Sequence, residues 1–298
     1  MNGGINVIIN RRRGITMIIL SAFCFAMMNV FIKLSGDLPV LQKSFFRNFV
    51  ALIIALIVMR QEKVGFIVPK ESRGWLFLRA FFGTIGLIAN YYAVDHLVLT
   101  DASMIQKLTP FFSMLASLWI LKEKPARYQW FAMFFALIGM IFVVKPSFHN
   151  AQLFASLIAL IGSFCAALAY TFVRRLSFTP IKSASIVFYF SLFSCVSVIP
   201  SMIMDFHVMS LTQLMYLLIA GLMAAGGQFS VTAAYQAAPA KDISIFDYSQ
   251  VLFVGIFGYL LYQQVPDSLS LIGYLIIFVT AYTMYYIGKR KNLSKKNG

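Results

Sequence analysis

The chain has 298 residues, of which 60% are hydrophobic and only 12% are charged. A water-soluble domain cannot bury that much apolar surface, whereas a bilayer requires it. The formal net charge of +15 could suggest a nucleic-acid partner, but Lys and Arg occur in short clusters between apolar runs rather than along one face. The composition therefore excludes a soluble domain and a nucleic-acid-binding surface, and it indicates a helical membrane protein.

The first apolar run follows three arginines at 11–13, as the core of a signal peptide would. It extends over about twenty residues without a small-residue cleavage site, so we expect it to be retained as the first span. The cysteines lie inside apolar runs with no disulfide or metal-site spacing, so we expect them to be packing residues and expect no metal or cofactor. They are Cys24, Cys165 and Cys195.

Ten apolar segments of spanning length follow one another along the chain, joined by short connections. They cover approximately 14–34, 39–59, 74–95, 100–121, 128–145, 152–173, 183–204, 212–236, 242–262 and 268–288. The linker between the first five and the last five is Pro146 to Asn150, and a short basic tail covers 289–298. The sequence therefore predicts an all-α membrane protein with ten transmembrane helices.

The fourth and ninth segments resemble each other. TDASMIQKLTPFFSMLASLWILKEKP at 100–125 aligns with KDISIFDYSQVLFVGIFGYLLYQQVP at 241–266 after a shift of 141 positions, and the same shift places Cys24 on Cys165. One offset that works at both ends indicates a duplicated unit. Each unit, at 14–145 and 152–288, carries an odd number of spans. The second unit should therefore enter the membrane from the opposite side, as in the inverted repeats of secondary transporters.

The basic residues are distributed unequally between the two sides of the membrane. With a cytoplasmic N-terminus, nineteen Lys and Arg fall in inner segments and one, Lys145, falls in an outer loop. The positive-inside rule then places both termini of this multi-pass protein in the cytoplasm. We expect the basic tail at 289–298 to contact anionic lipid.

Four charged residues lie well inside the predicted spans, where a charge costs at least about 2.5–3.5 kcal/mol and is by default functional. At about 1.5 Å per residue, Arg47 lies roughly 12 Å and Lys107 about 10 Å below the outer surface. Arg79 and Asp247 lie roughly 8 Å from the inner surface, so we expect a contact between them at an inner gate, with a purely structural pair as the equal alternative. A vertical separation of about 12 Å should keep Lys107 away from Asp247.

Uncharged polar residues also lie at deep helical positions. They are Asn29, Asn90, Gln106, Gln228 and Tyr248. In hydrocarbon such groups must face protein, water or a ligand, which leaves cavity lining and interhelical hydrogen bonds as equal alternatives. Pro110 falls inside the fourth span, where it predicts a kink and is a hinge candidate.

Two stretches and the duplication resemble the EamA branch of the drug/metabolite transporter superfamily, whose bacterial members have ten spans. The stretches are FFRNFVALIIAL at 45–56 and LTPFFSMLASLWILKEKPARYQW at 108–130. In the second unit, Val251 replaces the proline and Gln264 replaces the glutamate. The resemblance implies two pseudo-symmetric halves around a central cavity and transport of amino acids, other metabolites or toxic organic compounds, often outward. The cavity-lining spans of the family would carry Asn29, Arg79, Asn90, Gln106, Lys107, Gln228, Asp247 and Tyr248 here.

The sequence thus predicts a secondary transporter that exports a small polar organic solute, such as an amino acid, by alternating access. No G-x-x-x-x-G-K-[ST] motif occurs, so a gradient must drive transport, with Asp247 as the candidate proton-titrating group. Arg47 and Lys107 favour a carboxylate or phosphate on the solute, and Asp247 makes a zwitterion reasonable. The alternatives are a non-transporting receptor or scaffold and, less favoured, an intramembrane enzyme, for which the spans lack histidine and a second buried acid.

Overall fold

The structure is a computed structural model that describes residues 9–97, 102, 105–145, 153–263 and 265–294. These residues form helices and contain no β-strand. The helices are α1 (Arg11–Leu34), α2 (Val40–Gln61), α3 (Lys70–His96), α5 (Thr109–Ile120), α6 (Arg127–Val144), α7 (Leu153–Leu176), α8 (Ser183–Met204), α9 (Leu211–Ala237), α10 (Ala240–Ile243), α11 (Ser249–Tyr262) and α12 (Ser268–Ser294). A 3₁₀ segment, Ser244–Tyr248, joins α10 to α11. The expected linker at 146–150 and Gln264 lie outside the described residues.

Eight of the ten predicted spans are present as single helices. Within the described ranges, nine helical segments are long and apolar enough to cross a membrane, with α10, the 3₁₀ segment and α11 counted together as one. The fourth predicted span differs, because α5 has only 12 residues and begins at Thr109. The ninth differs as well, because it changes helix type along its length. Both exceptions fall in the two segments that align with each other.

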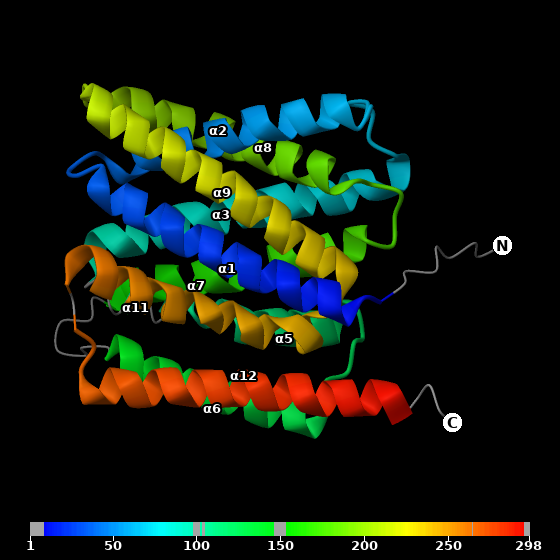
Figure 1. The fold of residues 1–298 in the computed structure, drawn as a ribbon. Coiled ribbons are helices and arrows are strands. Elements are labelled where there is room, and N and C mark those ends of the chain that lie inside the picture. Colours follow the sequence, from blue (N-terminus) through cyan, green and yellow to red (C-terminus); the bar gives the residue numbers. More distant parts are fainter. Residues whose placement is uncertain (1–8, 98–101, 103–104, 146–152, 264, 295–298) are drawn as a thin grey trace.

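The two sequence units are interleaved in space, since α1 packs most extensively on α9 and α3 on α7 (Figure 1). Small residues allow both contacts. The Ser21 hydroxyl of α1 donates to the Gly227 carbonyl of α9 at 2.9 Å. The positions equivalent under the shift of 141 are Gly162 of α7 and Gly86 of α3, which also meet. In lipid, such close backbone approach supplies much of the packing energy between helices.

We expect Gly86→Ala to destabilise the protein. A Cβ at Gly86 would lie 2.9 Å from the carbonyl oxygen of Gly162 and 3.0 Å from the backbone nitrogen of Ala166, and neither atom can rotate away. Overpacking of this kind costs about 1–3 kcal/mol. The matched control is Gly74→Ala on the same helix, where nothing lies within 4 Å and a helical alanine is favourable. Denaturant titration in micelles measures both changes, and equal free energies of unfolding would contradict the expected clash.

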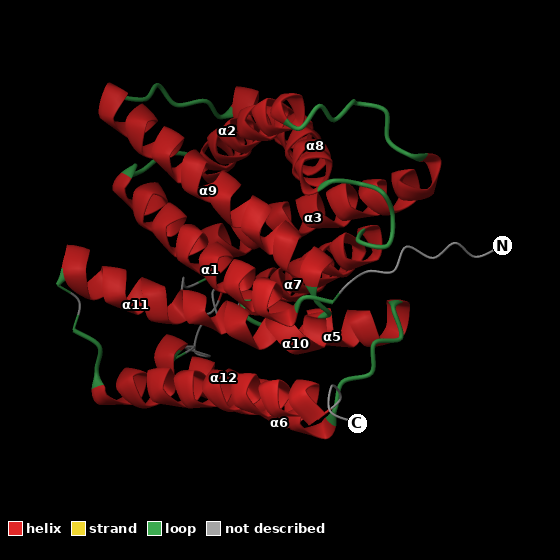
Figure 2. Cartoon of the chain, turned by 45° about the vertical axis from the view of Figure 1, so that its right-hand side comes forward, coloured by secondary structure: helices red, strands yellow, loops and turns green. Residues whose placement is uncertain are grey.

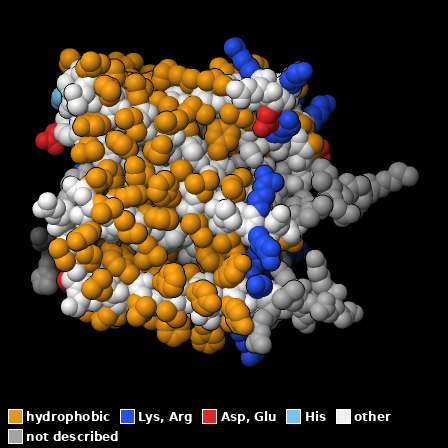
Figure 3. Space-filling model, in the orientation of Figure 1, with side chains coloured by type: hydrophobic (Ala, Val, Ile, Leu, Met, Phe, Trp, Pro, Cys, Tyr) orange, Lys and Arg blue, Asp and Glu red, His pale blue; other side chains and the backbone are white. Residues whose placement is uncertain are grey.

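The described chain begins and ends at the same end of the helix bundle, here called the terminal end (Figure 1). The Arg11 guanidinium of α1 donates to the backbone carbonyls of Met284 at 3.0 Å and Tyr285 at 3.3 Å on α12. Lys and Arg side chains gather at this end on the face shown in Figure 3, beside a wide hydrophobic band. The band has the character of a lipid-facing surface.

Helices α6 and α12 form a pair at one side of the molecule, as both ribbon views show (Figure 2). The pair meets the rest of the chain chiefly through the 3₁₀ segment and α11. A groove of about 590 Å³ runs along it and is lined almost entirely by apolar side chains, among them Phe131, Phe135 and Leu275. It contains none of the charged residues that lie deep in the spans, so the candidate site lies elsewhere.

Candidate functional site

Two interrupted helical segments meet in the middle of the molecule. Residues Lys107 and Leu108 form a turn immediately before α5, and the chain between α10 and α11 tightens into the 3₁₀ segment. The shift of 141 places Lys107 on Tyr248, so the two interruptions occupy equivalent positions in the two units. A short 3₁₀ stretch within a longer helix often marks a functional hinge, and interrupted membrane helices are tolerated where they line a cavity or are buried in protein.

The two interruptions are bonded to each other. The Tyr248 hydroxyl donates to the backbone carbonyl of Lys107 at 3.0 Å, and the Lys107 ammonium donates to the side-chain carbonyl of Gln250. The backbone carbonyl of Lys107, which lies in the turn, therefore has a hydrogen-bond donor. Lys107 and Asp247 form no ion pair, as predicted, but their segments are in contact. Depth was counted at a regular helical rise, from which both segments depart.

Asp247 lies in the 3₁₀ segment beside this contact. Its side chain is partly accessible, although both neighbours, Phe246 and Tyr248, are buried. It takes part in no ion pair or hydrogen bond with the described residues, and the nearest opposite charge that acts on it is that of Lys107. The predicted contact between Arg79 and Asp247 is absent, because the Arg79 guanidinium is held by other groups.

Arg79, on α3, is only 2% exposed. It donates to the Gln228 side-chain oxygen of α9 at 3.3 Å, and its guanidinium carbon lies 4.0 Å from the centre of the Phe190 ring. Its Nε has no hydrogen-bond partner. An amide and an aromatic face orient a guanidinium, but neither carries the negative charge that would neutralise it.

Arg47, on α2, has a similar environment. Its guanidinium lies 5.7 Å from the Phe25 ring of α1 and donates a long bond of 3.4 Å to the Tyr91 hydroxyl of α3. Its Nε is also buried without a partner. Neither Arg47 nor Arg79 has a carboxylate partner within the described ranges, which is costly for a cation at membrane depth.

Tyr170, on α7, lies near Arg79, Arg47 and Asp247. Its ring stacks on that of Tyr235, with centroids 5.0 Å apart. Tyr170 and Gln250 were not among the predicted site residues, and their contacts in the folded chain distinguish them.

The remaining predicted residues are less closely joined to this centre. Asn29 and Gln106 are exposed and Asn90 is half-buried, and none of the three has a side-chain hydrogen bond to the described part of the chain. Pro110 is buried in the first turn of α5, where a missing N–H costs nothing. It therefore starts a helix after a break instead of bending a continuous one, and its role as a hinge stays a prediction.

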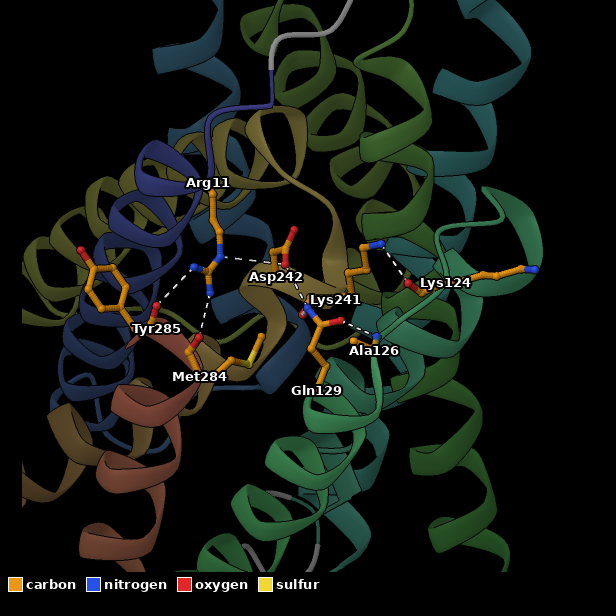
Figure 4. Close-up of polar contacts among 8 residues, drawn as sticks. All are labelled: Arg11, Lys124, Ala126, Gln129, Lys241, Asp242, Met284 and Tyr285. Atoms are coloured by element: carbon orange, nitrogen blue, oxygen red, sulfur yellow. Dashed lines mark hydrogen bonds and ion pairs between the residues drawn. The ribbon is translucent and has the colours of Figure 1, made fainter. Parts of the chain in front are cut away.

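A polar network around Asp242, at the start of α10, joins several elements at the terminal end (Figure 4). One carboxylate oxygen of Asp242 lies 3.9 Å from Arg11 Nε and accepts a hydrogen bond of 2.9 Å from Gln129 of α6. The Gln129 amide also reaches the Lys241 carbonyl at 3.0 Å, and the Lys241 ammonium donates to the Lys124 carbonyl at 2.9 Å. The network thus joins α1, α6, α10 and the loop before α6.

A second tie at the terminal end joins Arg174 of α7 to Glu123, three residues after α5. Their Nε and Oε1 atoms are 3.0 Å apart, and the side chains are only 2% and 14% exposed. Arg174 also donates to the Gln236 carbonyl at 3.2 Å, and the Ser117 hydroxyl donates to Glu123 at 2.6 Å. This pair was not predicted, because Arg174 was one of the nineteen basic residues counted in the inner segments.

Two further contacts join elements at the opposite end. Lys145 pairs with Asp267, and the Lys145 and Ser270 hydrogen bonds lower the pKa of that carboxyl to about 2. Gln42 exchanges two hydrogen bonds of 2.9 Å with the backbone of His207, which joins α2 to the loop before α9. Both ends are therefore joined by contacts between helices and loops.

These features define the class of protein, which is a multi-pass helical membrane protein with charged residues between two related units. The chain belongs to the EamA-like transporter family, whose model matches residues 12–145 and again residues 153–286. The family model matches both units, which confirms the predicted resemblance and the duplication.

Named relatives agree with this assignment. The chain is 28% identical over 270 residues to the pseudopaline exporter CntI of Pseudomonas aeruginosa, covering 90% of this chain and 94% of that protein. It is 27% identical to solute carrier family 35 member G1 of Mus musculus, covering 90% of this chain and 76% of the relative. A solved crystal structure superposes with a TM-score of 0.82 at 11% identity, covering 94% of this chain and 99% of the other, which shows that the fold is shared.

Proposed function

We propose that the protein is a secondary transporter that exports a small polar organic solute, an amino acid or related metabolite, across a bacterial inner membrane. The observation that carries the proposal is the contact between the two interrupted segments, which carry Lys107 and Asp247. In secondary transporters, interrupted helices near the midplane supply substrate and ion sites from their freed ends. The exporter named among the relatives supports the outward direction. No step of the proposal requires catalysis, a metal or a cofactor.

The two units act as inverted repeats in this proposal. Each holds an odd number of spans, and the α1–α9 contact has an equivalent in the α3–α7 contact, as expected for a pseudo-two-fold axis. The basic residues at the terminal end support a cytoplasmic location for both termini. The units correspond to 14–145 and 152–288, followed by the basic tail.

The polar contacts at the terminal end support an alternating-access mechanism. Helix ends are joined at the terminal end by the Asp242 network and by the Arg174–Glu123 pair. In the proposed orientation, this conformation is closed toward the cytoplasm. Loading from the cytoplasm then requires these polar contacts to separate while the two units rock around the Tyr248–Lys107 contact. A proton on Asp247 is the proposed coupling ion, because Asp247 is the deep carboxylate that no described group neutralises by contact.

The test is solute counterflow with purified protein in liposomes. We expect counterflow of at least one radiolabelled amino acid or organic acid, stimulated by a pH gradient, and none in liposomes without protein. An antibody-accessible tag at each terminus, tested in sealed cells, should report both ends on the cytoplasmic side. Absence of counterflow for the whole panel under every gradient would remove the transport proposal. Termini on opposite sides would remove the inverted repeat.

A further inference from the structure

The deep polar centre holds more positive than negative charge. Arg47, Arg79 and Lys107 are cationic, and Asp247 is the single carboxylate among them. None of the four forms an ion pair within the described residues. The acids that do pair, such as Glu123 and Asp242, bind other bases at the terminal end. With all groups ionised, the centre therefore carries two positive charges in excess.

The two arginines cannot remove this excess by losing a proton, because a guanidinium stays charged in proteins. Their described contacts are neutral groups: Gln228 and Phe190 for Arg79, and Tyr91 and Phe25 for Arg47. The unpartnered Nε atoms leave donors of the guanidinium fork unused. A carboxylate matches that fork with two parallel hydrogen bonds, which a lone amide oxygen cannot provide.

The single carboxylate complements this arrangement. Asp247 is partly accessible and accepts no hydrogen bond from a described group, so it can receive an ammonium. Lys107 already donates to Gln250, which fixes its position beside Asp247 and leaves further ammonium protons for a second acceptor. The centre thus offers one site for a cation and several for anions.

We propose that the substrate is an amino acid with more carboxylates than ammonium groups: its ammonium binds Asp247 and its carboxylates bind Arg47, Arg79 and Lys107. This inference rests on the proposed transport function and names the substrate class of the same site. Three carboxylates with one ammonium would neutralise the excess charge completely. Neutral amino acids would leave it in place, and they should therefore bind poorly.

The test is a series of compounds of increasing charge: L-alanine, L-glutamate and L-γ-carboxyglutamate, with one, two and three carboxylates. Their affinities are measured by charge movement in proteoliposomes on a solid-supported membrane and by ligand-induced thermal shift. We expect the affinity to rise at least tenfold from alanine to glutamate and again to γ-carboxyglutamate. Tricarballylate, with three carboxylates and no ammonium, should bind at least tenfold more weakly than γ-carboxyglutamate.

Variants assign the charges. Arg79→Gln and Arg47→Gln should each reduce the ratio of γ-carboxyglutamate to alanine affinity at least tenfold, and Arg47 supplies the test if the buried Arg79 variant does not fold. Asp247→Asn should abolish the preference for γ-carboxyglutamate over tricarballylate. The matched control is Arg175→Gln, an exposed arginine of α7, which should keep the wild-type ratio. Equal affinities for L-alanine, L-glutamate and L-γ-carboxyglutamate in a protein that transports them would overturn this inference alone. A protein that moves no solute would overturn the proposed function with it.

Discussion

Glu123→Gln is expected to lower the free energy of unfolding by about 3–5 kcal/mol, because removing one partner of a buried ion pair leaves the other charge without compensation. The charge left behind is that of Arg174, whose side chain is 2% exposed. Its remaining contacts, the Gln236 carbonyl and the Ser177 hydroxyl, are neutral. The measurement is denaturant titration of the purified protein in micelles, followed by tryptophan fluorescence and circular dichroism.

The control for that prediction is Glu62→Gln at the same end of the bundle. Glu62 pairs with Lys182 at 3.5 Å, but the side chains are 45% and 55% exposed, so the loss should be about 0–1 kcal/mol. The double variant Glu123→Gln with Arg174→Met should recover part of the stability, since no buried charge remains unpaired. Equal effects of Glu123→Gln and Glu62→Gln would contradict the buried-pair argument.

The hydrophobic pattern predicted most of the fold because the bilayer sets the length of each span and the short connections leave few alternatives. It did not predict the interruptions at Lys107–Leu108 and at Ser244–Tyr248. Apolar composition is compatible with either a continuous or an interrupted helix, and the choice depends on contacts such as Tyr248 to Lys107 that join residues 141 positions apart.

The sequence predicted which charged residues lie deep in the spans, but it did not predict which side chains contact one another. Sequence position gives the depth of Arg79 and Asp247, but the direction of a side chain around its helix depends on packing. Phe190 and Gln228, from α8 and α9, hold Arg79 away from Asp247. Arg174 was counted only among the basic residues of the inner segments, although the fold buries it against Glu123.

Asp247→Asn should reduce solute transport at least tenfold and abolish the stimulation by a pH gradient, while leaving the protein folded. The carboxylate is nearly isosteric with the amide and makes no hydrogen bond or ion pair with a described group, so the free energy of unfolding should change by no more than about 1 kcal/mol. Transport should respond because the substitution removes both the negative charge opposite Lys107 and the proposed proton site. Counterflow and pH-driven uptake in proteoliposomes measure the two effects separately.

A matched control for Asp247→Asn is Asp205→Asn, which removes the same charge from an exposed side chain at the end opposite the termini. It should leave both transport and its response to the pH gradient at the wild-type level. If Asp247→Asn unfolds the protein, Asp247 is a structural charge and the coupling role is wrong. If it transports with the wild-type rate and pH response, the carboxylate has no part in the cycle. Loss of transport in a folded protein, with normal transport by Asp205→Asn, is the result that only a carboxylate at the centre of the pathway explains.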